Sequence, residues 1–142
     1  MKNLIILLTL FIMTLNVSQA QSEKEMVKNI ITQFVEAADR QDADKVASVL
    51  HEDFRVVMNQ LFGSTEISFM NKAVYVQLIR DKKMGGGKRT IDFVSVDVVN
   101  QNASVKVLLK GKTMVFESLL HLIKTTDGKW QLINDLPFAT KI

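Results

Sequence analysis

Three polar side chains share one face of a predicted hairpin in residues 113–136. Asp127-Gly128 supplies the positive φ angles of a two-residue turn, so the alternating segments on either side are predicted to pair across it. In the register set by that turn, His121 faces Asn134, and Glu117 follows on the same face. Such groups can orient a small ligand, and a histidine can also transfer protons near neutral pH. The alternative is that His121 and Asn134 only satisfy each other across the strands.

The strand that carries His121 is apolar on both faces. The polar cluster shares its face with Val115, Leu119, Ile123, Trp130 and Leu132, whereas Met114, Phe116, Leu120 and Leu122 lie on the other. A strand that is apolar on both sides must be covered on both sides. We expect helices on one face, a second subunit on the other, and the polar cluster on the inner face. If Phe116, Ser118 and Leu120 point inward instead, the cluster belongs to the dimer interface.

Three helices are predicted upstream to position this hairpin. The Ser22-Glu23-Lys24-Glu25 spacing is that of a capping box, so the first helix is predicted to start there and to run to about Arg40. Asp42 is expected to cap a short second helix that ends near His51. Asn71 is expected to cap a third, with Val74, Tyr75, Leu78 and Ile79 inward, which stops before Gly85-Gly86-Gly87.

The remaining segments have the two-residue period of strands. Phe54, Val56 and Met58 share one face of a strand that begins at Asp53. Residues 89–99 and 103–111 form two further strands before the hairpin. A long helix, a short helix, a strand, a helix and four antiparallel strands make an α+β order.

The N-terminus has the pattern of a secretory signal peptide over residues 1–20, because Lys2 precedes an apolar run at 4–15 and small residues end at Ala20. We therefore expect one domain over residues 21–142, periplasmic or secreted, with no membrane anchor after cleavage. Loss of one lysine and no acid lowers the net charge from +3 to +2, too little for a nucleic-acid surface. The absence of cysteine excludes disulfides and a thiol nucleophile.

This order resembles the nuclear transport factor 2-like superfamily. The resemblance is carried by Phe34-Val35-Glu36-Ala37-Ala38 through Asp42, by Val49-Leu50-His51-Glu52-Asp53-Phe54, and by residues 127–134. It implies a cone-shaped curved antiparallel sheet wrapped around a long N-terminal helix with two shorter helices. The chain looks most similar to short exported bacterial members, the group named putative lumazine-binding or SnoaL-like. Such relatives are typically homodimers.

The superfamily also contains enzymes, among them ketosteroid isomerase, scytalone dehydratase and polyketide cyclases. The isomerase type uses a carboxylate base opposite a tyrosine and a protonated acid. No residue-by-residue transfer of that set is possible, because the first predicted helix has no tyrosine and Tyr75 lies on the third.

Two other motifs have simpler interpretations. Gly85-Gly86-Gly87-Lys88 lacks the spacing of a phosphate loop and is interpreted as a flexible turn within a local basic patch. His51 with Glu52 and Asp53 is interpreted as a helix-end cap, because neighbours on a strand point to opposite faces. We expect no metal site, since the chain has 2 histidines, and no cofactor.

The sequence thus predicts an exported, homodimeric, non-catalytic domain that binds a small apolar or aromatic molecule. The alternatives are an isomerase or dehydratase of the ketosteroid isomerase-like type, with His121 as base, and a purely structural dimerisation domain. The residues expected around the pocket are Phe34, Phe54, Met58, Tyr75, Glu117, His121, Trp130 and Asn134.

Overall fold

The computed structural model describes the backbone of residues 2–142 and the side chains from residue 19 onward. The described chain folds as α1 (Lys2–Asp39), α2 (Ala43–Val49), β1 (Leu50–Asn59), a short 3-10 turn (Leu61–Gly63), β2 (Ile67–Asn71), α3 (Lys72–Arg80), β3 (Thr90–Val99), β4 (Asn102–Lys110), β5 (Met114–Lys124) and β6 (Trp130–Lys141). The strands form one curved sheet in the order β2-β1-β6-β5-β4-β3. The predicted α+β cone is confirmed, with one parallel pair, β1 and β6, in the otherwise antiparallel sheet.

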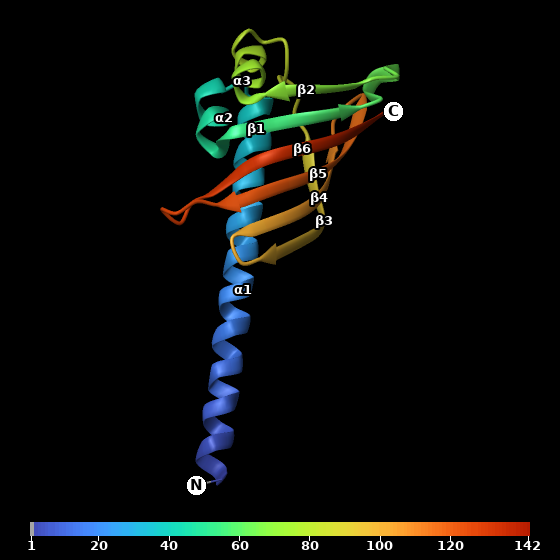
Figure 1. Ribbon diagram of the computed structural model, residues 1–142. Helices are drawn as coiled ribbons and strands as arrows, with labels where there is room; N and C mark the ends of the chain where they lie inside the picture. The colour runs from blue at the N-terminus through green and yellow to red at the C-terminus, as the bar shows by residue number, and fades with distance from the viewer. Residues whose placement is uncertain (1) are drawn as a thin grey trace.

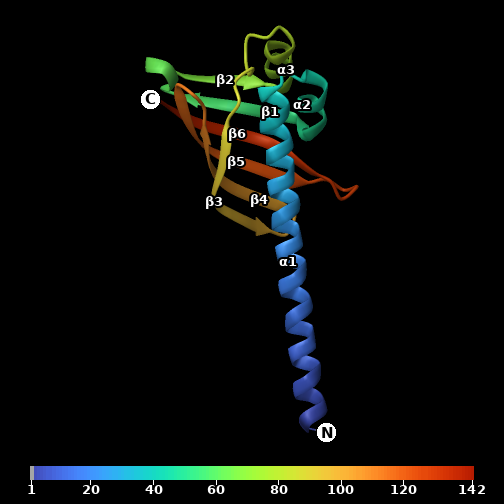
Figure 2. The ribbon, with the colours of Figure 1, turned by 180° about the vertical axis from the view of Figure 1, so that it is seen from behind.

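All three helices lie on one side of this sheet. α1 crosses the strands of the concave face, and α2 and α3 close one end of the cone (Figure 1). The view from behind shows α1 in front of the sheet and extending beyond it towards the N-terminus (Figure 2). Of the helices in the described residues, none is both long and apolar enough to cross a membrane. The expected signal peptide falls mostly on residues whose side chains lie outside the described part.

The predicted start of the first helix is wrong. α1 runs without interruption through Ser22, so no capping box forms there. Glu23 instead accepts hydrogen bonds from Lys124 Nζ and Trp130 Nε1, both at 2.7 Å. This contact fixes α1 against the start of β6 and the end of β5, and the Lys124 and Trp130 hydrogen bonds lower the pKa of the Glu23 carboxyl.

The predicted caps of the other two helices are confirmed. The Asp42 side chain accepts from the Lys45 backbone N–H, and the Asn71 side chain accepts from that of Val74. The inner face of α3 differs in one position, because Val76 is buried and Val74 is 48% exposed. β1 begins at Leu50 and includes His51, so the expected helix-end cap at His51 is wrong; its Nδ1 accepts the Asp53 N–H at 3.1 Å within β1.

The hairpin turn has three residues instead of two. The Thr125 N–H donates to the Lys129 carbonyl at 2.9 Å, and Gly128 takes a left-handed φ of +82°. This is a type I turn followed by a glycine bulge. Leu122, not Ile123, therefore pairs with Leu132. An irregularity between the Leu122 and His121 pairs then shifts the register by one, so that the predicted pairing of His121 with Asn134 is recovered.

The inner face of β5 is the opposite of the one expected. Ser118, Leu120 and Leu122 are buried beneath α1, whereas Leu119 is 42% exposed. Trp130 and Leu132 of β6 do lie on the inner face. The residues predicted to share one face of the hairpin therefore lie on two opposite faces of the sheet. The core joins this inner face to α1 through Val27, Ile31 and Val35, all fully buried.

The glycine loop before β3 is closely packed against α1. A Cβ at Gly85 would lie 2.0 Å from the Ala38 carbonyl oxygen, and the Gly86 N–H donates to the same oxygen at 3.3 Å. Only glycine permits this approach, because Gly85 also has a φ of +74°. The loop ends with Arg89, which is fixed to the end of α1 and leads directly into β3.

Candidate functional site

The predicted polar cluster lies on the outer face of the sheet. Asn134 Nδ2 is 3.3 Å from His121 Nδ1, and Arg55 Nε donates to Asn134 Oδ1 at 3.4 Å. Glu117 pairs with Lys106 on the same face. These contacts are exposed and open to water. The prediction that they face the inside of the cone is wrong, because the three-residue turn placed Leu122 opposite Leu132.

The other predicted pocket residues do lie inside the cone. Phe34, Phe54 and Tyr75 are buried and form one aromatic group, with ring centroids 5.6 to 6.3 Å apart. Trp130 is buried at the other end of the inner surface, where Glu23 holds its indole N–H. Met58 is half-buried against the core. These residues face the interior as expected, whereas the polar residues do not, and the role of the apolar residues in binding a ligand stays a prediction.

A different polar group, Asp135, enters the interior from β6. Its neighbours in the register are Val56 on β1 and Leu120 on β5, both buried. The residue is half-buried overall, but its Oδ1 is shielded from solvent and has no hydrogen-bond partner. Burial raises the pKa of Asp135 to about 7, and hydrogen bonding by the buried Ser118 hydroxyl partly offsets this effect.

Tyr75 on α3 belongs both to the aromatic group and to the surroundings of Asp135. Burial raises the pKa of the Tyr75 hydroxyl well above its ordinary value, and the charge of Asp135 raises it further. The phenol therefore stays protonated and can donate a hydrogen bond. We call Tyr75, Ser118 and Asp135 the inner cluster: two hydroxyls and one carboxyl in an apolar surface, each from a different element.

An ion pair lies near the inner cluster and carries no net charge. Arg89 Nε donates to Asp39 Oδ1 at 2.6 Å, and the Arg89 backbone N–H donates to Asp39 Oδ2 at 2.8 Å. The two side chains are 19% and 11% exposed, respectively. The Arg89 charge lowers the pKa values of both Asp135 and Tyr75, but in each it is outweighed by burial. Arg89 follows Lys88 of the predicted basic patch, but its charge is paired with Asp39 and is mostly shielded from water.

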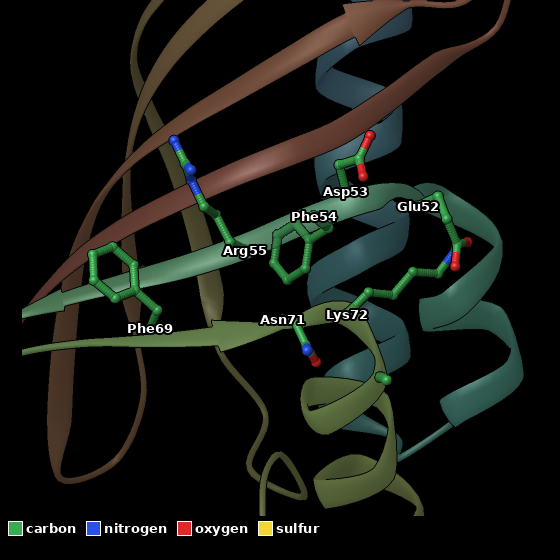
Figure 3. Close-up of a pocket in the computed structure, with 8 residues that line it drawn as sticks. Glu52, Asp53, Phe54, Arg55, Phe69, Asn71 and Lys72 are labelled. Carbon is green, nitrogen blue, oxygen red and sulfur yellow. The ribbon is translucent and has the colours of Figure 1, made fainter.

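A hollow lies at the edge formed by β1, β2 and the start of α3. It has a volume of about 530 Å³ and is lined by Glu52, Asp53, Phe54, Arg55, Phe69, Asn71, Lys72 and Ala73. Figure 3 shows Lys72 reaching towards Glu52, and the two atoms Nζ and Oε2 are 3.2 Å apart. Since Lys72, Asn71 and Arg55 already have partners in the protein, this hollow offers no unsatisfied buried group.

Metal ligands do not gather in the described residues: no group of three or more histidine, aspartate or glutamate side chains is placed to hold an ion. The Ser118 hydroxyl and the Arg89 charge both lower the pKa of Asp135, against the larger effect of burial. The hydroxyl groups of the inner cluster can donate and accept hydrogen bonds, and the Asp135 carboxyl can bind and release a proton.

Sequence reasoning missed Asp135 and Ser118, although each carried a signal. Aspartate is depleted in strands, and Asp135 stands in a strand segment with isoleucine and leucine nearby. Ser118 interrupts a β5 face that is otherwise apolar. A short polar residue that remains within an apolar strand face is a sign of a buried polar site.

Comparison with known protein families identifies a match for this chain. The sequence matches a family over residues 22–136, which is most of the chain. The chain belongs to the family described as Putative lumazine-binding. The matched range contains both hydroxyls of the inner cluster and Asp135. A comparison with curated proteins gives no significant match.

Solved structures support the fold of this chain. An NTF-2 like protein of unknown function from Silicibacter pomeroyi is 15% identical, with a TM-score of 0.71 over 86% of this chain and 98% of the other. An NTF2-like protein of unknown function from Shewanella baltica is 12% identical, with a TM-score of 0.73 over 84% and 94%. A ketosteroid isomerase-like protein from Erwinia carotovora atroseptica is 15% identical, with a TM-score of 0.66 over 84% and 96%. These likenesses show an NTF2-like fold.

Proposed function

We propose that this chain binds a small, largely apolar or aromatic molecule inside the cone, with the inner cluster as its polar anchor. The observation that carries the proposal is the buried Asp135 Oδ1 without a partner. A buried polar atom without a hydrogen bond costs about 1–3 kcal/mol, and a ligand donor would remove that cost. Tyr75 adds a second fixed group beside an aromatic wall. An apolar surface with a few convergent polar groups is the usual form of a small-molecule site.

The family description suggests a ligand of suitable chemistry. Lumazine is a flat pteridine dione, so it has both N–H donors and carbonyl acceptors. Asp135 can accept from such an N–H, and the Tyr75 hydroxyl can donate to a carbonyl. The aromatic group of Phe34, Phe54 and Tyr75 suits a flat ring, because stacked or edge-on aromatic contacts add about 0.5–1.5 kcal/mol.

The test is calorimetric titration of the protein with lumazine, together with native mass spectrometry of protein purified from its own host. We expect saturable binding, weakened about tenfold or more by Asp135→Asn and by Tyr75→Phe. Asp97→Asn removes an exposed carboxylate from β3 and should leave affinity unchanged. Protein that carries no added mass and binds no flat heterocycle would contradict the proposal and favour the purely structural alternative.

A second candidate function is acid–base catalysis at the inner cluster. It is favoured by Asp135, whose pKa of about 7 suits a group that takes up and releases a proton at neutral pH. Tyr75 would stabilise a developing oxyanion. His121 cannot serve as the base for a substrate in the cone, because it lies on the outer face. Isomerisation of a cyclic enone lost in Asp135→Asn but kept in His121→Ala would support this function; no turnover of any cyclic ketone would remove it.

We also propose that the outer face is covered by a second copy of the chain. Leu119, Phe69 and Phe138 are exposed on this face to 42%, 68% and 60%. Soluble monomers rarely leave a large contiguous apolar patch in water. The proposed homodimer is tested by light scattering coupled to size-exclusion chromatography, and a monomer at micromolar concentration would contradict it.

Export is the last part of the proposal, and it is supported by the apolar run at residues 4–15 and the small residues before Gln21. The intact mass of protein recovered from the periplasm or the medium should correspond to residues 21–142. Recovery of the full-length chain from the cytoplasm alone would contradict export.

A further inference from the structure

We infer that the cone selects a ring that carries a positively charged N–H donor over the same ring carrying a carboxylate. This inference rests on the proposed binding function and adds to it the charge of the ligand. It follows from two features of the interior. The hydrogen-bond acceptor Asp135 Oδ1 has no partner, and the nearby cation Arg89 is already paired with Asp39.

The acceptor without a partner is Asp135 Oδ1, which is closed off from water between β1 and β5. A ligand that approaches it must bring a donor, because water is excluded there. Tyr75 and Ser118 can each donate one hydrogen bond as well as accept, so they adapt to either kind of ligand. The carboxyl of Asp135 is the member of the inner cluster that discriminates by charge.

The cation that could attract a carboxylate is Arg89, and it is not free. Its Nε and its backbone N–H are both bound to Asp39, at 2.6 and 2.8 Å. The glycine loop fixes Arg89 to the end of α1, so releasing it would break a partly buried ion pair. An anionic ligand would therefore meet Asp135 without a compensating charge, whereas a cationic ligand would supply one.

The charged and titratable groups that face Asp135 are few. Tyr75 comes from α3 and Arg89 from the segment before β3, while the charge of Asp39 on α1 raises the pKa of Tyr75. The register neighbours on β1 and β5 are apolar, and Ser118 is a neutral hydroxyl. Because Asp135 titrates at about 7, its ionised fraction rises about tenfold between pH 6 and pH 8, and affinity for a cation should rise with it.

The experiment uses three probes on one ring: 4-aminoquinoline, which is protonated at neutral pH, 4-methylquinoline and quinoline-4-carboxylate. Each is titrated calorimetrically into the wild-type protein at pH 6 and pH 8, with lumazine as the reference ligand. At pH 8 we expect the aminoquinoline to bind at least tenfold more tightly than the carboxylate. We also expect the aminoquinoline to bind less tightly at pH 6 than at pH 8. Asp135→Asn should reduce that preference to about threefold or less, and Asp97→Asn should preserve it.

Equal affinities, or tighter binding of the carboxylate, would overturn the inference while leaving the proposed function in place. A preference for the amine that persists in Asp135→Asn would also overturn it. If no quinoline binds but lumazine does, the inference alone fails. If neither binds, the proposed function fails as well.

Discussion

Replacing Asp135 with asparagine should stabilise the protein relative to the wild type, and this gain in stability should grow as the pH rises. The pKa of this carboxyl is about 7 in the folded chain against an ordinary value of 3.8, which corresponds to about 4 kcal/mol of destabilisation once both states are ionised. Between these two values the native state binds more protons than the unfolded state. The free energy of unfolding of the wild type should therefore fall as pH rises through this window. For this single group the fall between pH 5 and pH 8 is about 2–3 kcal/mol.

The assay is urea unfolding followed by the fluorescence of Trp130, at pH 5, 6, 7 and 8, for the wild type and for Asp135→Asn. The difference in unfolding free energy between the two should grow by about 2–3 kcal/mol in favour of the variant from pH 5 to pH 8. Other titrating groups cancel in this difference, and Asp97→Asn should show no such trend. A difference that stays flat across the range would refute the argument that burial raises the pKa of Asp135 in the folded chain.

Three further predictions follow from particular contacts. Glu23→Gln should cost about 1–3 kcal/mol at pH 7 by weakening two hydrogen bonds of a charged carboxylate, and the cost should shrink as pH falls below about 4.5, measured by the same urea assay. Gly63 has a positive φ and no neighbour within 4 Å of an added Cβ, so Gly63→Ala should lower the free energy of unfolding by about 1 kcal/mol. Gly85→Ala adds a clash with the Ala38 carbonyl, so it should cost roughly 3 kcal/mol or more, and similar losses in both glycine variants would contradict the close packing. Leu119→Glu should convert the proposed dimer into a monomer in light scattering; an unchanged mass would place the interface elsewhere.

The fold could be predicted from sequence because its signals are local and agree with one another. Caps at Asp42 and Asn71 and the two-residue period after the glycine loop each reflect contacts within a few residues. The start of α1 could not be predicted in the same way. Glu23 is suited to a capping box, but its carboxylate is used by Lys124 and Trp130, about a hundred residues away.

The position of the candidate site depends on the register of the hairpin, which the alternation of apolar and polar residues alone does not determine. A two-residue turn and a three-residue turn differ by one position, and a slip of one position exchanges the two faces of a strand. Strict alternation from Trp130 and Leu132 directs Asn134 inward. The irregularity next to the Leu122 and Leu132 pair reverses this, so that Asn134 turns outward and Asp135 turns inward.

The bulge therefore decides which polar residue can meet a ligand. A bulge leaves one residue unpaired and redirects the side chains that follow it, which is why bulges often occur next to functional sites. In this chain it places the carboxyl of Asp135 inside the cone and the amide of Asn134 outside. Since a carboxyl carries charge and an amide does not, the same irregularity also underlies the proposed preference of the cone for a cationic ligand. Deleting Ile133 removes the extra residue but keeps Asn134 opposite His121 and Asp135 opposite Leu120, so the binding of amines and the pH dependence of stability assigned to Asp135 should both persist.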